Sequence, residues 1–210
     1  AITAASFVQT TGSGTTTFDG AVDTNAVLGV NVTNDAIALN NTINTTNAGT
    51  VTLEADTAAV TIAAAGNITA DGAVLLTGVT GINTAGDVTT TNDDVTFASA
   101  TTLTGNVAVD TGAGAGTITF ASLLDATVAE TLDLDAGTGN IDFDGVVGGG
   151  VRLGAMTIAN AGNVTADSAI TAASFVQTTG SGTTTFDGAV DTNAVLGVNV
   201  TNDAIALNNT

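Results

Sequence analysis

The first 42 residues of the chain recur without a single change as residues 169–210. An identity of this length, at an offset of 168 residues, marks a tandem array in which one unit ends at Ser168 and the next begins at Ala169. We therefore expect one complete repeat over 1–168 and the start of the next over 169–210, as a single continuous structure within a longer repetitive protein. Repeats of this kind build length and surface, whereas a catalytic site is usually built once.

The residues of the repeat are typical of strands and turns. Thr, Val, Ala, Gly, Asn and Asp dominate, and Pro, Cys, Trp, Tyr and His are absent. Thr and Val favour strands, while Gly, Asn and Asp favour turns. The segment 122–134 keeps a helical period best, but its ending, TLDLD, alternates as a strand does. We predict an all-β chain with many short strands.

A shorter period lies inside the long one. Phe97, Phe120 and Phe143 are 23 residues apart, and each ends a short alternating segment that follows a turn residue. Segments of this kind start near positions 14, 35, 58, 77, 93, 116, 139 and 162, which gives about eight coils of about 20–23 residues per repeat. Such coils bury their inner faces by stacking, which predicts a right-handed parallel β-helix, or β-solenoid.

The predicted register makes two geometric statements. The three Phe side chains should form one inward column, because the same position in successive coils lies directly above its predecessor. With strands about 4.8 Å apart, one repeat should measure about 38 Å. The two identical segments should then be related by eight whole coils and only a modest rotation.

The charge of the chain restricts its partners. The net charge is −19, and Arg152 is the only basic residue. This excludes nucleic acid as a natural partner and disfavours anionic membrane surfaces. No run of 18 apolar residues exists, so we expect no membrane insertion of this segment. Arg152 is expected on the outer face, paired with a nearby Asp.

Two stretches carry a family resemblance. GTITFASLLDATVAETLDLDAGTGNIDFDGVVGG and the later GNVTADSAITA resemble the repetitive passenger regions of filamentous-haemagglutinin-like adhesins and autotransporters. The resemblance lies in period, composition and alternation, and it covers essentially the whole chain. It implies a secreted or surface-anchored bacterial right-handed β-helix that serves in adhesion or as a fibre.

Four carboxylates are the candidates for a metal site. Asp133, Asp135, Asp142 and Asp144 alternate along neighbouring strands, and calcium takes six to eight oxygen ligands. The glycine-rich calcium-binding nonapeptide is absent, however, and alternation places Asp142 on the outer face, opposite Ile141 and Phe143. We therefore expect solvated carboxylates and no metal or other cofactor. Calcium is the ion that these residues would bind if the expectation fails.

No residue is assigned a catalytic role, and we expect no enzyme. The lack of His and Cys excludes nucleophilic triads and zinc sites. Carboxylate pairs also serve in glycoside hydrolysis, but no Tyr or Trp is present to stack on a sugar. An ice-binding face would need an unbroken Thr row. The outward row that the register predicts is broken and runs Thr17, Ala38, Thr96, Thr119, Asp142, Thr165.

These observations favour a structural protein. We expect an extracellular or cell-surface fibre or adhesin stalk, whose partner is the protein itself through end-to-end continuation of repeats or filament assembly. The sequence leaves a surface receptor or polysaccharide ligand open. The alternatives are a surface-layer or calcium-ordered matrix protein, and an ice-binding solenoid.

Overall fold

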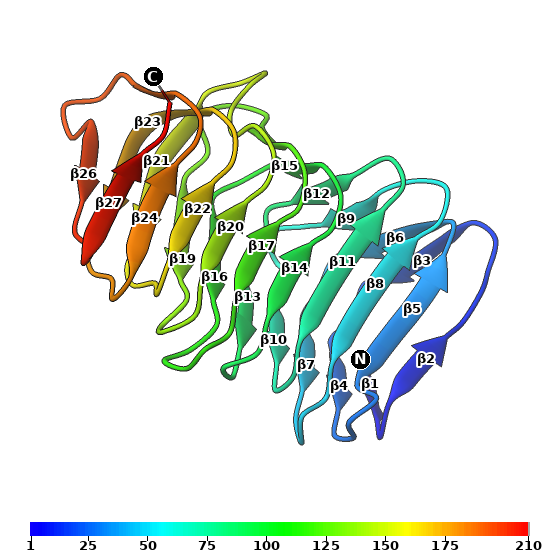
Figure 1. Ribbon diagram of the computed structural model, residues 1–210. Coiled ribbons are helices and arrows are strands. Elements are labelled where there is room, and N and C mark those ends of the chain that lie inside the picture. Colours follow the sequence, from blue (N-terminus) through cyan, green and yellow to red (C-terminus); the bar gives the residue numbers. More distant parts are fainter. Residues whose placement is uncertain (210) are drawn as a thin grey trace.

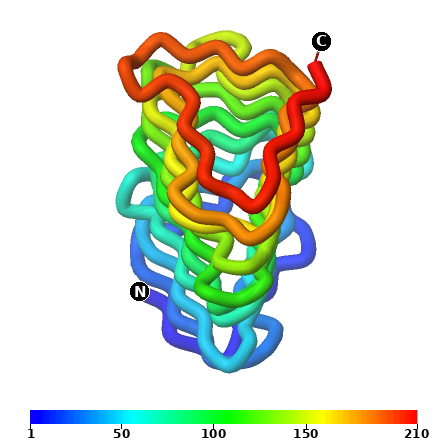
Figure 2. The backbone as a smooth tube through the Cα atoms, turned by 60° about the vertical axis from the view of Figure 1, so that its left-hand side comes forward, coloured from blue at the N-terminus to red at the C-terminus, as the bar shows by residue number. Residues whose placement is uncertain are grey.

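The chain is a parallel β-solenoid. The computed structural model describes residues 1–209, and these residues form 27 strands and no helix. The strands pair in parallel with strands of the preceding and following coils, so that three sheets run along the molecule (Figure 1). The chain visits the sheets in turn, and the ten strands of the second sheet mark ten coils stacked on one another (Figure 2). The prediction of an all-β solenoid is confirmed.

The strands of each sheet follow at intervals of one coil. The first sheet contains β1 (Ile2–Ala4), β4 (Val22–Thr24), β7 (Ile43–Thr45), β10 (Ile68–Ala70), β13 (Val88–Thr90), β16 (Val107–Asp110), β19 (Leu132–Asp135), β21 (Leu153–Ile158), β23 (Ile170–Gln177), β25 (Val190–Thr192) and β26 (Val198–Val200). The second contains β2 (Phe7–Gln9), β5 (Val30–Asn34), β8 (Val51–Ala55), β11 (Val74–Gly78), β14 (Val95–Phe97), β17 (Ile118–Phe120), β20 (Ile141–Phe143), β22 (Val164–Ala166), β24 (Thr183–Phe186) and β27 (Ala204–Leu207). The third contains β3 (Thr15–Phe18), β6 (Ala36–Leu39), β9 (Val60–Ile62), β12 (Ile82–Thr84), β15 (Thr101–Leu103) and β18 (Leu124–Ala126).

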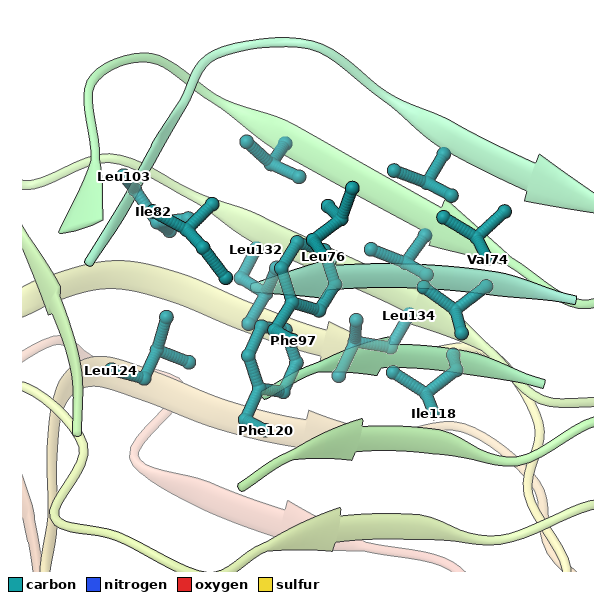
Figure 3. Close-up of a cluster of buried hydrophobic side chains, with 14 of the residues drawn as sticks. Val74, Leu76, Ile82, Phe97, Leu103, Ile118, Phe120, Leu124, Leu132 and Leu134 are labelled. Atoms are coloured by element: carbon teal, nitrogen blue, oxygen red, sulfur yellow. The ribbon is translucent and has the colours of Figure 1, made fainter. Parts of the chain in front are cut away.

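The core is a set of stacked columns of inward side chains. Most strands have three residues, of which the first and third are buried, because successive side chains of a strand point to opposite faces. The rings of Phe97 and Phe120 stack on one another (Figure 3). Phe120 lies between Phe97 and Phe143, with ring centroids 4.7 and 5.6 Å away and planes within 9° and 4° of parallel. The predicted Phe column is therefore confirmed, and Ala166 and Phe186 continue it.

Glycine is required where corners of adjacent coils stack closely. Gly29, in the turn between β4 and β5, has a φ of 51°, a conformation that L side chains rarely adopt. A Cβ on Gly29 would lie 2.0 Å from the Thr50 carbonyl oxygen of the next coil. Its counterpart Gly197 has a φ of 55°, but the nearest atom to a Cβ there is Thr192 Oγ1, at 3.8 Å. The difference between the two sites is the coil stacked on Gly29.

The predicted register is wrong between residues 58 and 92. The segments that start near 14 and 35 form β3 and β6 of the third sheet, whereas those near 93, 116 and 139 form strands of the second sheet. β12 connects β9 to β15 in the third sheet, and β11 connects β8 to β14 in the second. The predicted start near 77 falls inside β11, close to its end, and not at the beginning of a strand. All three sheets use the same short alternating strands, so alternation does not identify the sheet.

The corrected register changes the length of the repeat in coils. Near the C-terminal end the third sheet merges with the first. The strands β21 and β23 begin in line with the third sheet and end in the first sheet, so they belong to both. The third sheet continues from Leu124 through Val147 to Ile170, and from Ile170 to Val190. Ile170 therefore lies on the third sheet's line, although its counterpart Ile2 lies in the first sheet.

The 168-residue repeat thus spans seven and two-thirds coils, because it begins in the first sheet and ends one sheet short of completing the eighth coil. This agrees with the predicted figure of about eight. The expected displacement by eight whole coils with only a modest rotation is wrong, since the second copy starts on a different sheet.

Candidate functional site

The outer face of the first sheet carries two surface depressions. One, of about 300 Å³, is lined by Asp110, Asp133 and Asp135, with small Ala and Thr side chains between them. The other, of about 390 Å³, lies toward the N-terminal end and is lined by Asp23 and Asn25 among Thr and Ala. The first depression combines carboxylates with methyl groups, and the second also contains side-chain amides.

The carboxylates of the first depression partly serve the turns that follow their strands. Asp110 accepts a hydrogen bond from the Gly112 N–H at 2.7 Å, and Asp135 accepts one from the Gly137 N–H at 3.0 Å. These contacts satisfy backbone donors that a turn leaves without a ladder partner. Asp133, on the outward side of β19 two residues before Asp135, is exposed.

The other two candidate aspartates lie on the second sheet. Asp142 is the outward residue of β20, half-buried between Thr119 and Thr165 of the adjacent coils, and Asp144 follows at the corner. Burial raises the pKa of Asp142, the charges of Asp144 and Asp167 raise it further, and a hydrogen bond with Thr165 opposes the shift. The ionised carboxylate of Asp142 is therefore less stable than that of a fully exposed aspartate.

The four predicted residues do not form one group. Asp133 and Asp135 belong to the first sheet, and Asp142 and Asp144 to the second sheet and its corner. Over residues 1–209, no set of three or more His, Cys, Asp or Glu side chains has the arrangement of a metal site. The outward Thr row is interrupted as expected, although its members come from two sheets: Thr17 and Ala38 from the third, the others from the second.

Arg152, the one basic residue of the chain, is held by three polar contacts. Its guanidinium donates to the Asp191 carboxylate at 2.5 Å and to the carbonyl oxygens of Ala172 and Asp191, both at 2.8 Å. The expected pairing with an Asp is confirmed. The contacts also extend from the end of the first repeat into the second, across two successive coils.

A polar trio of buried and half-buried side chains occurs in both copies of the repeat, and the sequence did not predict it. The Thr184 hydroxyl donates to Gln177 Oε1 at 2.5 Å and accepts a hydrogen bond from the Asn202 side-chain amide at 2.9 Å. Thr16, Gln9 and Asn34 make the same contacts in the first copy. The available signal was a Gln at an inward position of the alternating segment FVQ.

Glu130 is a second buried polar residue that sequence reasoning missed. Its carboxylate accepts hydrogen bonds from the Thr127 hydroxyl at 2.6 Å and from the Val128 N–H at 2.7 Å. Burial acts to raise the pKa of Glu130, but these and neighbouring backbone hydrogen bonds together outweigh it and lower the pKa. The ionised carboxylate of Glu130 therefore stabilises the turn that contains Thr127 and Val128.

Within the described residues, no helix is long and apolar enough to cross a membrane. No protein-family model matches the chain, and comparisons with curated proteins and with solved structures found no match. The fold is established by the structure, and the resemblance to adhesins rests on period, composition and alternation.

Proposed function

We propose that this chain is a segment of an extracellular or cell-surface fibre, or adhesin stalk, whose length is set by the number of stacked repeats. The proposed partner is the protein itself, through continuation of one repeat into the next. The observation that carries the proposal is the unbroken parallel pairing from β1 to β27, which passes from the first repeat into the second without a gap. A rod built in this way gains length with each added coil.

Two further observations support a stalk. The buried columns of Val, Ile, Leu and Phe run through all but the coils at the two ends, so each coil is stabilised by its neighbours. The net charge of −19 makes neighbouring rods repel one another, which favours separate fibres over lateral clumping. Location at the cell surface follows from the resemblance to adhesins and is part of the proposal.

Rod growth is tested by adding a repeat. A chain with one more copy of residues 1–168 inserted after Ser168 should be longer by about 37 Å, which is seven and two-thirds coils at about 4.8 Å each. Small-angle scattering of both chains measures the increase in maximum dimension at constant cross-section. An increase in cross-section without this gain in length would refute the stalk.

Location is tested on intact cells of the source organism. Antibodies raised against the folded chain should label unpermeabilised cells. Labelling that appears only after lysis would refute the surface assignment while leaving the rod intact.

A further inference from the structure

The two identical segments form the same local structure. Ile2 pairs with Val22 as Ile170 pairs with Val190, and β3 pairs with β6 in the register in which β24 pairs with β27. The Phe7 and Phe18 rings meet edge to face at 5.3 Å and 77°. The rings of their counterparts Phe175 and Phe186 meet at 5.2 Å and 77°.

The same segments nevertheless lie on different sheets. β3 belongs to the third sheet, whereas its counterpart β24 lies in the second sheet, between β22 and β27 (Figure 1). β2 belongs to the second sheet, whereas its counterpart, residues 175–177 of β23, pairs with β21 in the first sheet. Each strand of the second copy thus lies one sheet earlier than its counterpart in the first copy: second-sheet strands move to the first sheet, third-sheet strands to the second, and first-sheet strands to the third.

The solenoid accommodates this shift because its three sides are alike. β4 of the first sheet, β14 of the second and β12 of the third are all three-residue strands with buried first and third residues and a half-buried middle residue. A segment that fits one side therefore presents the same inward pattern on the others.

We infer that an array of this repeat is a three-fold screw, in which each repeat turns its surface by one sheet, about 120°, and advances it by about 37 Å. The inference rests on the proposed function, because it concerns repeats that continue one another. Since each repeat ends one-third of a coil short of eight, three repeats complete 23 whole coils and restore the original orientation.

The consequence for interaction is that every surface feature is displayed on all three sides. The turn that contains Val27 and Leu28 is exposed and lies at the corner between the first and second sheets. Its counterpart with Val195 and Leu196 is also exposed and lies between β25, on the line of the third sheet, and β26, on that of the first. A partner that recognises one surface of the repeat would meet it from any direction around the fibre.

Paired cysteines in the 210-residue chain test the strand count on which the screw depends. The chain has no Cys, so every thiol is an introduced one. Leu75 and Thr96 are directly paired outward residues of the second sheet, about 4.8 Å apart, within the Cα separation of disulfides. We expect Leu75→Cys with Thr96→Cys to oxidise readily. Thr80→Cys with Thr96→Cys should not, although a register of eight whole coils would stack Thr80 on Thr96. Asn31→Cys with Thr52→Cys is the control, because this pair is adjacent in both registers.

The outcomes separate this inference from the proposed function. Preferential closure of the pair at 80 and 96, or closure of neither test pair while the control closes, would overturn the screw and leave the solenoid standing. Failure of the control pair would overturn the solenoid and the stalk with it. In a longer array, electron micrographs should show the rod repeating every three units, about 110 Å, and an image that repeats every 37 Å or so would contradict the screw.

Discussion

Phe97 and Phe120 stack almost in parallel, 4.7 Å apart, in the centre of the solenoid. They belong to adjacent coils of the second sheet, so their separation is the strand spacing itself. Aromatic rings that repeat at the coil period thus extend one column through several coils, and a change in one ring affects the coils on both sides.

Replacement of Phe120 by Ala should destabilise the chain by about 3–5 kcal/mol, because it opens a cavity between Phe97 and Phe143 in a fully buried column. Urea unfolding followed by circular dichroism measures the loss. Thr119→Ala, at the adjacent outward position, is the matched control and should change stability little. Equal effects of the two substitutions would contradict the inward assignment of Phe120.

Gly29→Ala should cost about 1–3 kcal/mol more than Gly197→Ala. Both positions have the same local sequence and a positive φ, so the conformational strain of a Cβ is shared. Only at Gly29 does the Cβ also meet the Thr50 carbonyl oxygen of a stacked coil. Thermal unfolding of the two variants checks the difference, and indistinguishable melting temperatures would show that Thr50 does not lie over Gly29.

Asp142→Asn should stabilise the chain at neutral pH. The folded-state pKa of Asp142 lies above its ordinary value of 3.8, so the folded state binds the proton more tightly than the unfolded state does. The folded state is therefore favoured below the ordinary pKa, and this advantage is lost as pH rises through the raised value. The gain from Asp142→Asn should vanish in acid, where the native carboxyl is protonated in both states. Melting temperatures across a pH series measure it, and a gain that persists unchanged in acid would contradict this account.

Glu130→Gln should have the opposite sign. The folded-state pKa of Glu130 is below its ordinary value of 4.5, so its contribution to stability is present above that value and is lost as pH falls through the lowered pKa. Glu130→Gln should therefore destabilise the chain at neutral pH and differ less from the native protein in acid. The same pH series serves as the measurement, with Glu54→Gln, at an exposed position of β8, as the control. A neutral-pH effect no larger than that of the control would contradict the role of Glu130 at its corner.

Removal of divalent ions should leave the fold unchanged, because the coils are held by an apolar core and by parallel backbone pairing. Circular dichroism and melting temperature with and without EDTA test this expectation. A fall of more than about 3 °C, the shift that about 1 kcal/mol produces in a chain of this size, would assign the carboxylates around Asp142 or Asp133 to a calcium site. It would also favour the calcium-ordered matrix alternative.

The sequence predicted the features that depend on rare residues at a fixed period. Phe97, Phe120 and Phe143 are among only seven Phe residues, and their spacing of 23 specified one column. Between residues 58 and 92 no aromatic residue marks the sheet, and Thr, Val, Ile and Ala suit all three sides equally. The register was lost there because the local pattern carries no information about which side it occupies.

Polar partners were predictable only in kind. An Asp partner for Arg152 followed from composition, but Asp191 is 39 residues away and one of many acidic residues, so only the coil register could select it. Gln177 was missed for a different reason. Alternation predicts a polar side chain outward, whereas Gln177 points inward, where it accepts a hydrogen bond from the Thr184 hydroxyl and donates one to the Thr179 carbonyl oxygen.

The direction of the backbone hydrogen bonds determines how such a rod responds to tension. In each sheet the bonds join one coil to the next, so they run along the rod axis and a pull on its two ends loads them in series. Every junction between coils then bears the same force, so the weakest junction separates first while the others stay closed. Each coil of about 21 residues that comes free adds roughly 70 Å of extended chain. The molecule would lengthen in steps under a modest force, as an extensible tether does. When the load is removed, each released coil could refold onto neighbouring coils that are still folded.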